Sequence, residues 1–190
     1  MMTLNDAQIE WLNAYTAGIW NLNQKTGLVD IAGNFSCRHQ GLTDFKGIKF
    51  GTITGYFSCR NNQLTSLEGS PVSVDGDFVC THNQLTSLEG APESVGGGLY
   101  CRYNQLTSLM GAPKSVGRYL YFAGNPVSER TILAIYKIMK RRMSYTASLL
   151  QYWKQMPEED KLLMYKGNPY LTDDKRRMYE LMNKVKGISI

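Results

Sequence analysis

The chain has 190 residues, of which 43% are hydrophobic, and its formal net charge is +5 at pH 7. This length suits one domain or a tight pair of domains, and the positive charge excludes a strongly acidic mimic of DNA. No segment is long and apolar enough to cross a bilayer, and the start of the chain lacks the basic and apolar regions of a signal peptide. We therefore expect a cytoplasmic protein whose four cysteines are thiols.

The first 30 residues predict an N-terminal cap. An amphipathic helix is expected over residues 5–16, with Thr3 or Asn5 as its N-cap. Its apolar surface would come from Ile9, Trp11, Leu12 and Tyr15.

A hairpin is expected to follow this helix. The mostly apolar segments 19–22 and 28–31 flank the run Asn-Gln-Lys-Thr-Gly, which is typical of a hairpin turn. Because an open end of a repeat array exposes apolar surface, we interpret Trp11 and Trp20 as a lid over that end, in preference to a platform for a ligand.

Residues 31–125 repeat one sequence motif with a period of 21 residues. The sequence NQLTSL begins at Asn62, at Asn83 and at Asn104. Each copy has too few apolar residues to bury by itself, so the copies are expected to stack as the coils of a solenoid. The apolar positions of one copy are Val74, Phe78, Cys80, Leu85 and Leu88.

Each coil is predicted to hold one very short strand followed by an asparagine. In one copy Leu99 and Cys101 point inward and Tyr100 points outward, and such strands would stack about 4.8 Å apart into a parallel sheet on one side of the array. A buried asparagine can both donate to and accept from backbone groups where the chain leaves the sheet. This column is Asn62, Asn83, Asn104 and Asn125, with Gln40 in the first coil.

The return path of each coil is predicted to be irregular. Gly-Ala-Pro or Gly-Ser-Pro follows the leucines, which is turn chemistry in place of a helix. The first coil is also one residue longer than the others, and the extra residue falls within residues 47–52.

These motifs resemble those of leucine-rich repeat proteins. The spacing L-x-L-x-x-N-x-L and the short period over residues 35–126 are similar to the repeats of bacterial effectors. The wording NQLTSLEGAPxSVGG, the entry TGLVDIAGNFSC and the closing AGNPVS resemble small leucine-rich repeat proteins encoded by tailed phages. The resemblance implies an α/β solenoid with a parallel sheet on one face, and it implies a partner without naming one.

Residues 126–190 lose the repeat and predict a C-terminal cap of three or four helices. This region holds 13 Lys or Arg against 7 Asp or Glu, a net charge of +6, which leaves −1 for residues 1–125. Two basic clusters, 140–142 and 175–177, could hold phosphates, but solvated helix ends are the favoured interpretation.

Neither metal binding nor catalysis is predicted. Cys37, Cys59, Cys80 and Cys101 hold equivalent positions in successive coils, and a straight column cannot bring four sulfurs about 2.3 Å from one ion. No cysteine or cluster of carboxylates completes a triad with either histidine, and the C-terminal region has no cysteine for a ubiquitin-ligase mechanism. We therefore expect a protein that is not an enzyme and needs no cofactor.

The outward side of the predicted sheet is the candidate site, and we call it the strand face. It contains no Lys or Glu and is rich in Tyr and Arg, which dominate interface hot spots. Tyrosine also favours strands for structural reasons. The predicted partner-binding residues are Arg38, Tyr56, Arg60, His82, Tyr100, Arg102, Tyr103, Tyr119 and Tyr121.

Three functions fit these residues. The first is a phage-encoded effector that binds and inhibits a host protein, such as one of anti-phage defence, in the bacterial cytoplasm. The second is binding of nucleic acid or nucleotide through the strand face and the basic C-terminal helices, with arginines on phosphates and tyrosines stacked on bases. The third is an assembly role in a virion. The first is the preferred hypothesis, and its phage origin follows from the resemblance alone.

Overall fold

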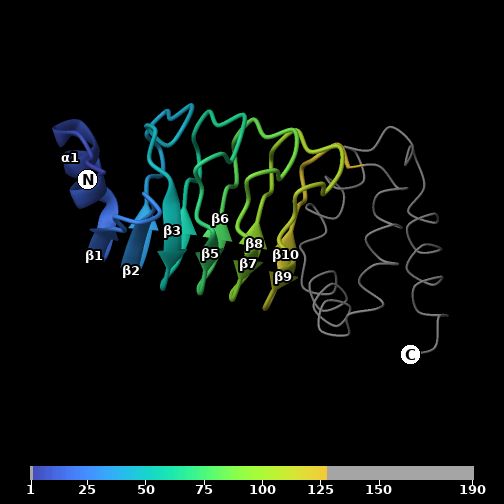
Figure 1. Cartoon of the computed structure of the whole chain (residues 1–190). Helices are drawn as coiled ribbons and strands as arrows, with labels where there is room; N and C mark the ends of the chain where they lie inside the picture. The colour runs from blue at the N-terminus through green and yellow to red at the C-terminus, as the bar shows by residue number, and fades with distance from the viewer. Residues whose placement is uncertain (1, 128–190) are drawn as a thin grey trace, which may run out of the picture.

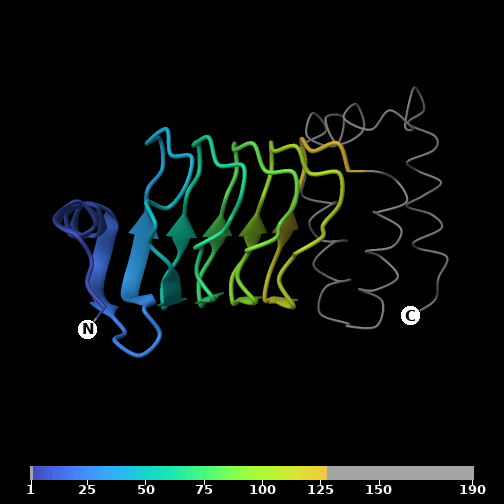
Figure 2. The same ribbon diagram turned by 45° about the horizontal axis from the view of Figure 1, so that its top comes forward.

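The computed structural model describes residues 2–127, and the predictions for residues 128–190 lie outside this part. The described residues form a β-solenoid, whose coils stack in a row between the N-terminal helix and the last strands (Figure 1; Figure 2). The described part contains no helix that meets the length and hydropathy needed to span a bilayer. The predicted parallel repeat with a period near 21 residues is therefore confirmed.

The single helix of the described part, α1 (Asp6–Tyr15), covers the N-terminal end of the core. Asn5 is the N-cap and forms a capping box with Gln8, so the first turn has its backbone donors satisfied. Trp11 is buried, and its ring centroid lies 5.2 Å from that of Phe35 and 6.3 Å from that of Phe50. The tryptophan therefore acts as a lid over apolar surface.

The predicted hairpin is present as β1 (Thr16–Leu22) and β2 (Val29–Ser36), which pair antiparallel. Trp20 lies opposite Ile31, and its indole Nε1 donates to the Oδ1 of Asn13 on the helix at 2.8 Å. The hairpin thus joins the helical lid to the first coil.

Every coil after the hairpin has two short strands, where the sequence predicted one. The long strand β2 begins both ladders, because its first half pairs with β3 and its second half with β4. The first ladder continues through β3 (Phe50–Ile53), β5 (Ser73–Val74), β7 (Ser94–Val95) and β9 (Ser115–Val116). The second continues through β4 (Phe57–Ser58), β6 (Phe78–Val79), β8 (Leu99–Tyr100) and β10 (Leu120–Tyr121).

A column of glycines separates the two ladders. A Cβ on Gly76 would lie 2.7 Å from the carbonyl oxygen of Gly55 in the preceding coil, and one on Gly97 would lie 2.8 Å from that of Gly76. The backbones of neighbouring coils therefore approach too closely here for a side chain. The chain bends at these glycines, so the extended segment of each coil divides into two strands.

The longer first coil ends in a bulge. Val29 pairs with Phe50 and Ile31 pairs with Ile53, so the register between β2 and β3 shifts by one residue. The backbone N–H of Thr52 donates to the Oδ1 of Asp30 at 2.7 Å and holds the extra residue. The bulge lies at residues 51–52, inside the range that the sequence predicted.

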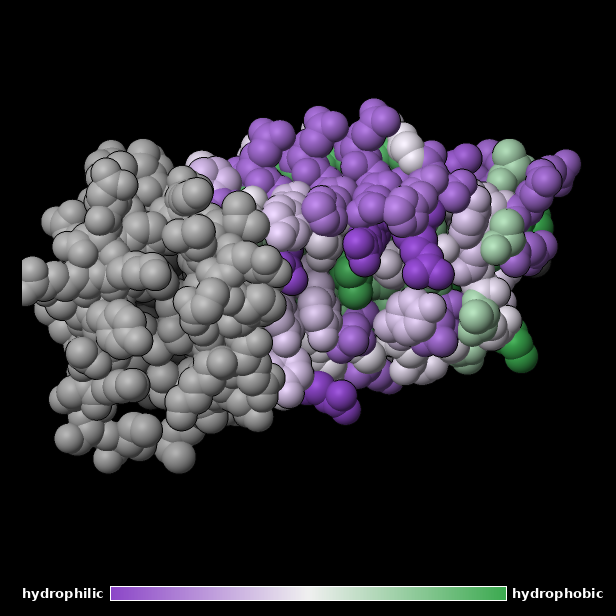
Figure 3. All heavy atoms as spheres, turned by 180° about the vertical axis from the view of Figure 1, so that it is seen from behind, coloured by the Kyte–Doolittle hydropathy of each residue, from purple (hydrophilic) through white to green (hydrophobic). Residues whose placement is uncertain are grey.

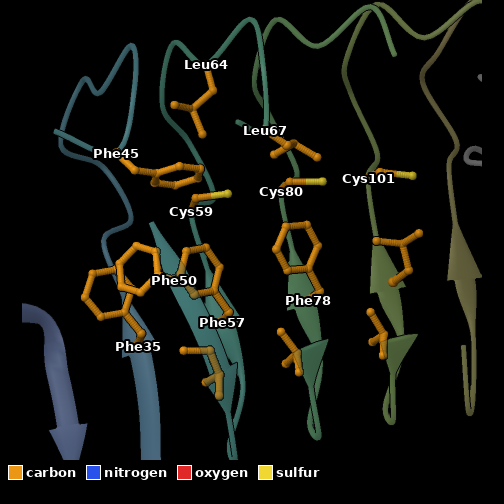
Figure 4. Packing of buried hydrophobic residues seen from close by; sticks show 14 of the residues in the cluster. Phe35, Phe45, Phe50, Phe57, Cys59, Leu64, Leu67, Phe78, Cys80 and Cys101 are labelled. Atoms are coloured by element: carbon orange, nitrogen blue, oxygen red, sulfur yellow. The ribbon is translucent and has the colours of Figure 1, made fainter. Parts of the chain in front are cut away.

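The core is built from columns that run through successive coils. Phe57 and Phe78 stack with centroids 5.6 Å apart, and Cys59, Cys80 and Cys101 follow one another in a row (Figure 4). All of these side chains are fully buried. Each coil thus contributes a thin layer, and burial requires the layer on either side.

The asparagine column is confirmed, with a correction at its first position. Asn83 donates from Nδ2 to the carbonyls of Cys59 and Cys80, at 3.0 and 3.1 Å, and its Oδ1 accepts from the N–H of Leu64. Asn62, Asn104 and Asn125 make the same pattern. Gln40 is exposed instead, and only its backbone N–H joins the ladder, through the Oδ1 of Asn62.

Candidate functional site

The second ladder positions the strand face by simple alternation. In β6, Phe78 points into the core and Val79 points outward, and Cys80 and Thr81 continue the alternation. The nine predicted partner-binding residues all reach the surface: Arg38, Tyr56, Arg60 and His82 are exposed, and Tyr100, Arg102, Tyr103, Tyr119 and Tyr121 are half-buried. Four other outward positions are buried under their neighbours, which corrects the prediction for Ser58, Thr81, Gly98 and Ala123.

Three tyrosines form a cluster on the last two coils. The rings of Tyr100 and Tyr121 are stacked, with centroids 4.7 Å apart and an interplanar angle of 7°, and Tyr119 meets Tyr121 at 5.7 Å and 60°. Tyr100 lies over Gly98, where a Cβ would come within 2.8 Å of its ring. Partial burial, followed by the nearby charge of Asp77, raises the pKa of Tyr100, so its hydroxyl remains protonated at neutral pH.

Three arginines share one position in different coils, and we call them the arginine column: Arg38, Arg60 and Arg102. Arg102 lies 5.1 Å from the centroid of the Tyr103 ring and donates to its hydroxyl. Arg60 donates from Nε to the Oδ1 of Asn61 at 3.2 Å. The guanidinium groups of Arg60 and Arg102 therefore each contact the residue that follows them.

The residue after the arginine position adopts a left-handed backbone in every coil. Four of the five non-glycine residues with positive φ in the described part lie here: His39 (φ 60), Asn61 (57), His82 (55) and Tyr103 (52). Gly124 (φ 71) completes what we call the left-handed column. Sequence reasoning grouped these residues but missed their strain, although the glycine and asparagine at equivalent positions are a signal for it.

The left-handed conformation follows from the asparagine ladder. The N–H of His82 donates to the carbonyl of Arg102, and the next residue, Asn83, turns inward to reach the carbonyl of Cys80. The chain must therefore reverse direction within one residue. Side chains at this residue project from a fixed turn and stack along the column: the His82 and Tyr103 rings lie 4.4 Å apart at 14°.

The N-terminal and C-terminal ends of the face differ in chemistry. Arg38, His39 and Asn61 form a polar group, in which the amide of Asn61 lies 3.3 Å from Nδ1 of His39. Tyr56 stands apart from the tyrosine cluster, two coils before Tyr100. The structure therefore joins His82, Tyr103 and Arg102 into one group and the tyrosines of β8 and β10 into another.

The electrostatic effect of the arginines is visible at His82. Partial burial, followed by the charges of Arg60 and Arg102, lowers the pKa of His82 below its ordinary value. The imidazole is consequently neutral at pH 7, and it sits in a locally positive field.

The four cysteines are buried thiols in one column. Burial raises the pKa of Cys37 and of Cys101 to about 12, so neither forms the thiolate that nucleophilic or metal chemistry requires. In the part of the chain that the structure describes, no three His, Cys, Asp or Glu side chains converge as metal ligands. The absence of enzymatic activity stays a prediction.

Seen from behind, the described surface is mostly hydrophilic, and its hydrophobic side chains gather mainly toward the N-terminal end (Figure 3). Comparisons with models of known protein families, with curated proteins and with solved structures found no match.

Proposed function

We propose that this protein is a non-enzymatic binding protein that engages another protein through its strand face. The observation that carries this proposal is the arrangement of Tyr and Arg on a rigid ladder: Tyr100 and Tyr121 stack at 4.7 Å, and Arg102 lies over Tyr103. Side chains that already hold one conformation lose little entropy on binding. Tyr and Arg are also the residues that contribute most at protein interfaces.

The class of repeat is part of the same proposal. The segment from Leu99 to Leu106 fits the leucine-rich repeat pattern, with Cys101 at the second leucine position and Asn104 at the asparagine. The parallel ladder and the asparagine ladder support this assignment. In this proposed repeat, the described residues form two strands per coil and a return path without a helix.

A host protein is the proposed partner. The resemblance of the repeat wording to small phage-encoded proteins supports an effector that inhibits a host protein, such as one of anti-phage defence, in the bacterial cytoplasm. The basic clusters at 140–142 and 175–177 lie outside the described residues, and they are the competing candidate for the binding site.

Affinity capture from a bacterial lysate with the full chain tests the proposal. We expect at least one protein to be captured by wild type, lost with the Tyr100→Ala/Tyr121→Ala variant and lost with Arg60→Glu, while the melting temperature stays within a few degrees. Lys49→Glu is the matched control, because it makes the same change of charge as Arg60→Glu. Lys49 is exposed and lies just before β3, away from the strand face. If every captured protein survives the strand-face changes, the proposed site is wrong.

Binding of nucleic acid or nucleotide, through the Arg and Tyr of the strand face and the basic C-terminal residues, is a second candidate, and among the described residues the arginine column favours it. It would show a steep loss of affinity with salt, because bound phosphates release counterions. The stacked tyrosines do not favour it, because the rings of Tyr100 and Tyr121 cover one face of each other. A base would need those faces for stacking.

A further inference from the structure

The left-handed column places bulky side chains at a backbone conformation that glycine would adopt without strain. A left-handed backbone costs an L-residue about 1–2 kcal/mol, and glycine avoids this cost. Gly124 shows that glycine fits the turn, yet His39, His82 and Tyr103 hold rings there. Strain kept at a bulky residue points to a task for the side chain.

The same turn concentrates positive charge. Neither the arginine column nor the left-handed column contains a carboxylate, and neither does the neighbouring outward column, which holds Ser36, Ser58, Val79, Tyr100 and Tyr121. Across residues 2–127 the sequence has 8 Lys or Arg and 9 Asp or Glu, so the local excess is not a property of the whole solenoid. Arg60 and Arg102 lie on either side of His82 along the column and are two coils apart, about 10 Å at the strand spacing.

The groups between these arginines suit a carboxylate-bearing ligand. Thr81 separates them in sequence position, but its hydroxyl is buried and donates to the carbonyl of Tyr100, which leaves His82 as the outward polar group. A guanidinium can hold a carboxylate with two parallel hydrogen bonds, and a neutral imidazole can donate one more. Each of these two arginines donates a hydrogen bond to the residue that follows it, and the stacking of the coils sets the spacing of their backbone positions.

We propose that the turn formed by Arg60, His82 and Arg102 binds an acidic segment of the partner protein, with its carboxylates on the two guanidinium groups. This inference rests on the proposed function and names the chemistry of the partner. A protein segment fits better than a nucleic acid, because the His82 and Tyr103 rings stack on each other and so each already has one face covered. A base binds by stacking on an open ring face, whereas a carboxylate needs only the guanidinium and imidazole N–H donors.

The histidines give a direct assay. The chain has only two, His39 and His82, and both lie in the left-handed column. Their ring signals can be followed by NMR in the full chain, and His39→Asn assigns them while keeping a residue that tolerates the backbone. The probe is a short oligoglutamate peptide, with its oligoglutamine counterpart as the uncharged control.

We expect oligoglutamate to shift the His82 ring signals and to raise the pKa of His82, because bound carboxylates offset the charges of Arg60 and Arg102. Oligoglutamine should do neither. Arg60→Gln should weaken peptide binding roughly tenfold, as expected for a paired charge at an interface. Lys49→Gln removes one positive charge elsewhere and should leave the affinity unchanged.

Three results would overturn the inference. Equal weakening by Lys49→Gln would show attraction to net charge alone. Loss of binding with Arg141→Gln but not with Arg60→Gln would place the acidic ligand on the C-terminal basic cluster. Tighter binding of a short oligothymidylate, dependent on Arg60, would assign the turn to nucleic acid.

The outcome separates this inference from the proposed function. If Tyr100→Ala/Tyr121→Ala loses a captured protein and Arg60→Gln does not, the strand face binds a protein but the acidic-segment inference fails. If oligoglutamate binds through Arg60 and no captured protein depends on the face, the proposed protein-binding function fails.

Discussion

The inward and outward columns of the second ladder differ in how strictly their residues repeat from coil to coil. Inward positions are nearly constant: Cys80 and Cys101 recur in one column, and Asn83 and Asn104 recur in another. Outward positions change from coil to coil, as where Arg60 gives way to Thr81. The inward residues satisfy a requirement that every coil shares, whereas the identity of most outward side chains varies from coil to coil. We therefore assign folding to the inward side of the ladder and propose that the outward side is used for binding.

The strongest test of the inward column is Asn83→Ala compared with Cys80→Ala. Asn83 makes three hydrogen bonds to buried backbone groups, and leaving such groups unpaired costs about 1–3 kcal/mol each. Removing a thiol leaves only a small cavity. Urea unfolding at matched m-values should therefore show the larger loss for Asn83→Ala, and equal losses would count against the asparagine ladder.

The glycine column should tolerate substitution almost as poorly. We expect Gly76→Ala to destabilise the fold by about 1–3 kcal/mol, because its Cβ would lie 2.7 Å from the carbonyl oxygen and 2.8 Å from the carbonyl carbon of Gly55. Gly41→Ala isolates the other cost: a Cβ there would meet only a side-chain atom at 3.8 Å, but φ is positive (+65), so its loss reports backbone strain without a clash. A larger loss at Gly41 would mean that backbone strain, and not the close approach of coils, dominates.

The outward columns should respond to pH with only a small effect on stability. The pKa of His82 is lowered in the folded state, so the unfolded chain binds a proton more readily. Stability should therefore fall as pH decreases from about 6.5, the ordinary pKa of histidine, toward the lower folded value. His82→Asn should remove this loss while keeping the left-handed turn. Unfolding midpoints that stay parallel for the two proteins across this range would contradict the assignment.

The sequence was sufficient for the features that every coil repeats. The period, the asparagine column and the inward cysteines are visible because Asn83 and Cys80 recur at fixed spacing, and the capping residue Asn5 is a local signal. The strand face was predicted by alternation alone.

The missed features depend on contacts between coils. The first ladder was not predicted because Ser73 and Val74 are too short a segment to show alternation, and they become a strand only by pairing with Thr52 and Ile53. The left-handed backbone of His82 and Tyr103 was missed because bulky residues rarely adopt it, and only Asn61 and Gly124 at equivalent positions signal it in the sequence.

The most direct measurement is the free energy of unfolding and the partner affinity of His82→Gly, determined side by side. Glycine relieves the backbone strain at φ 55, which stabilises the folded state by about 1–2 kcal/mol. It also loses the stacking with Tyr103 and makes the unfolded chain more flexible, which together destabilise the folded state by a similar amount. We predict that stability stays within about 1 kcal/mol of wild type while partner binding is lost. A large loss of stability with partner binding intact would show that the ring serves the fold, and would contradict the separation of inward folding from outward binding.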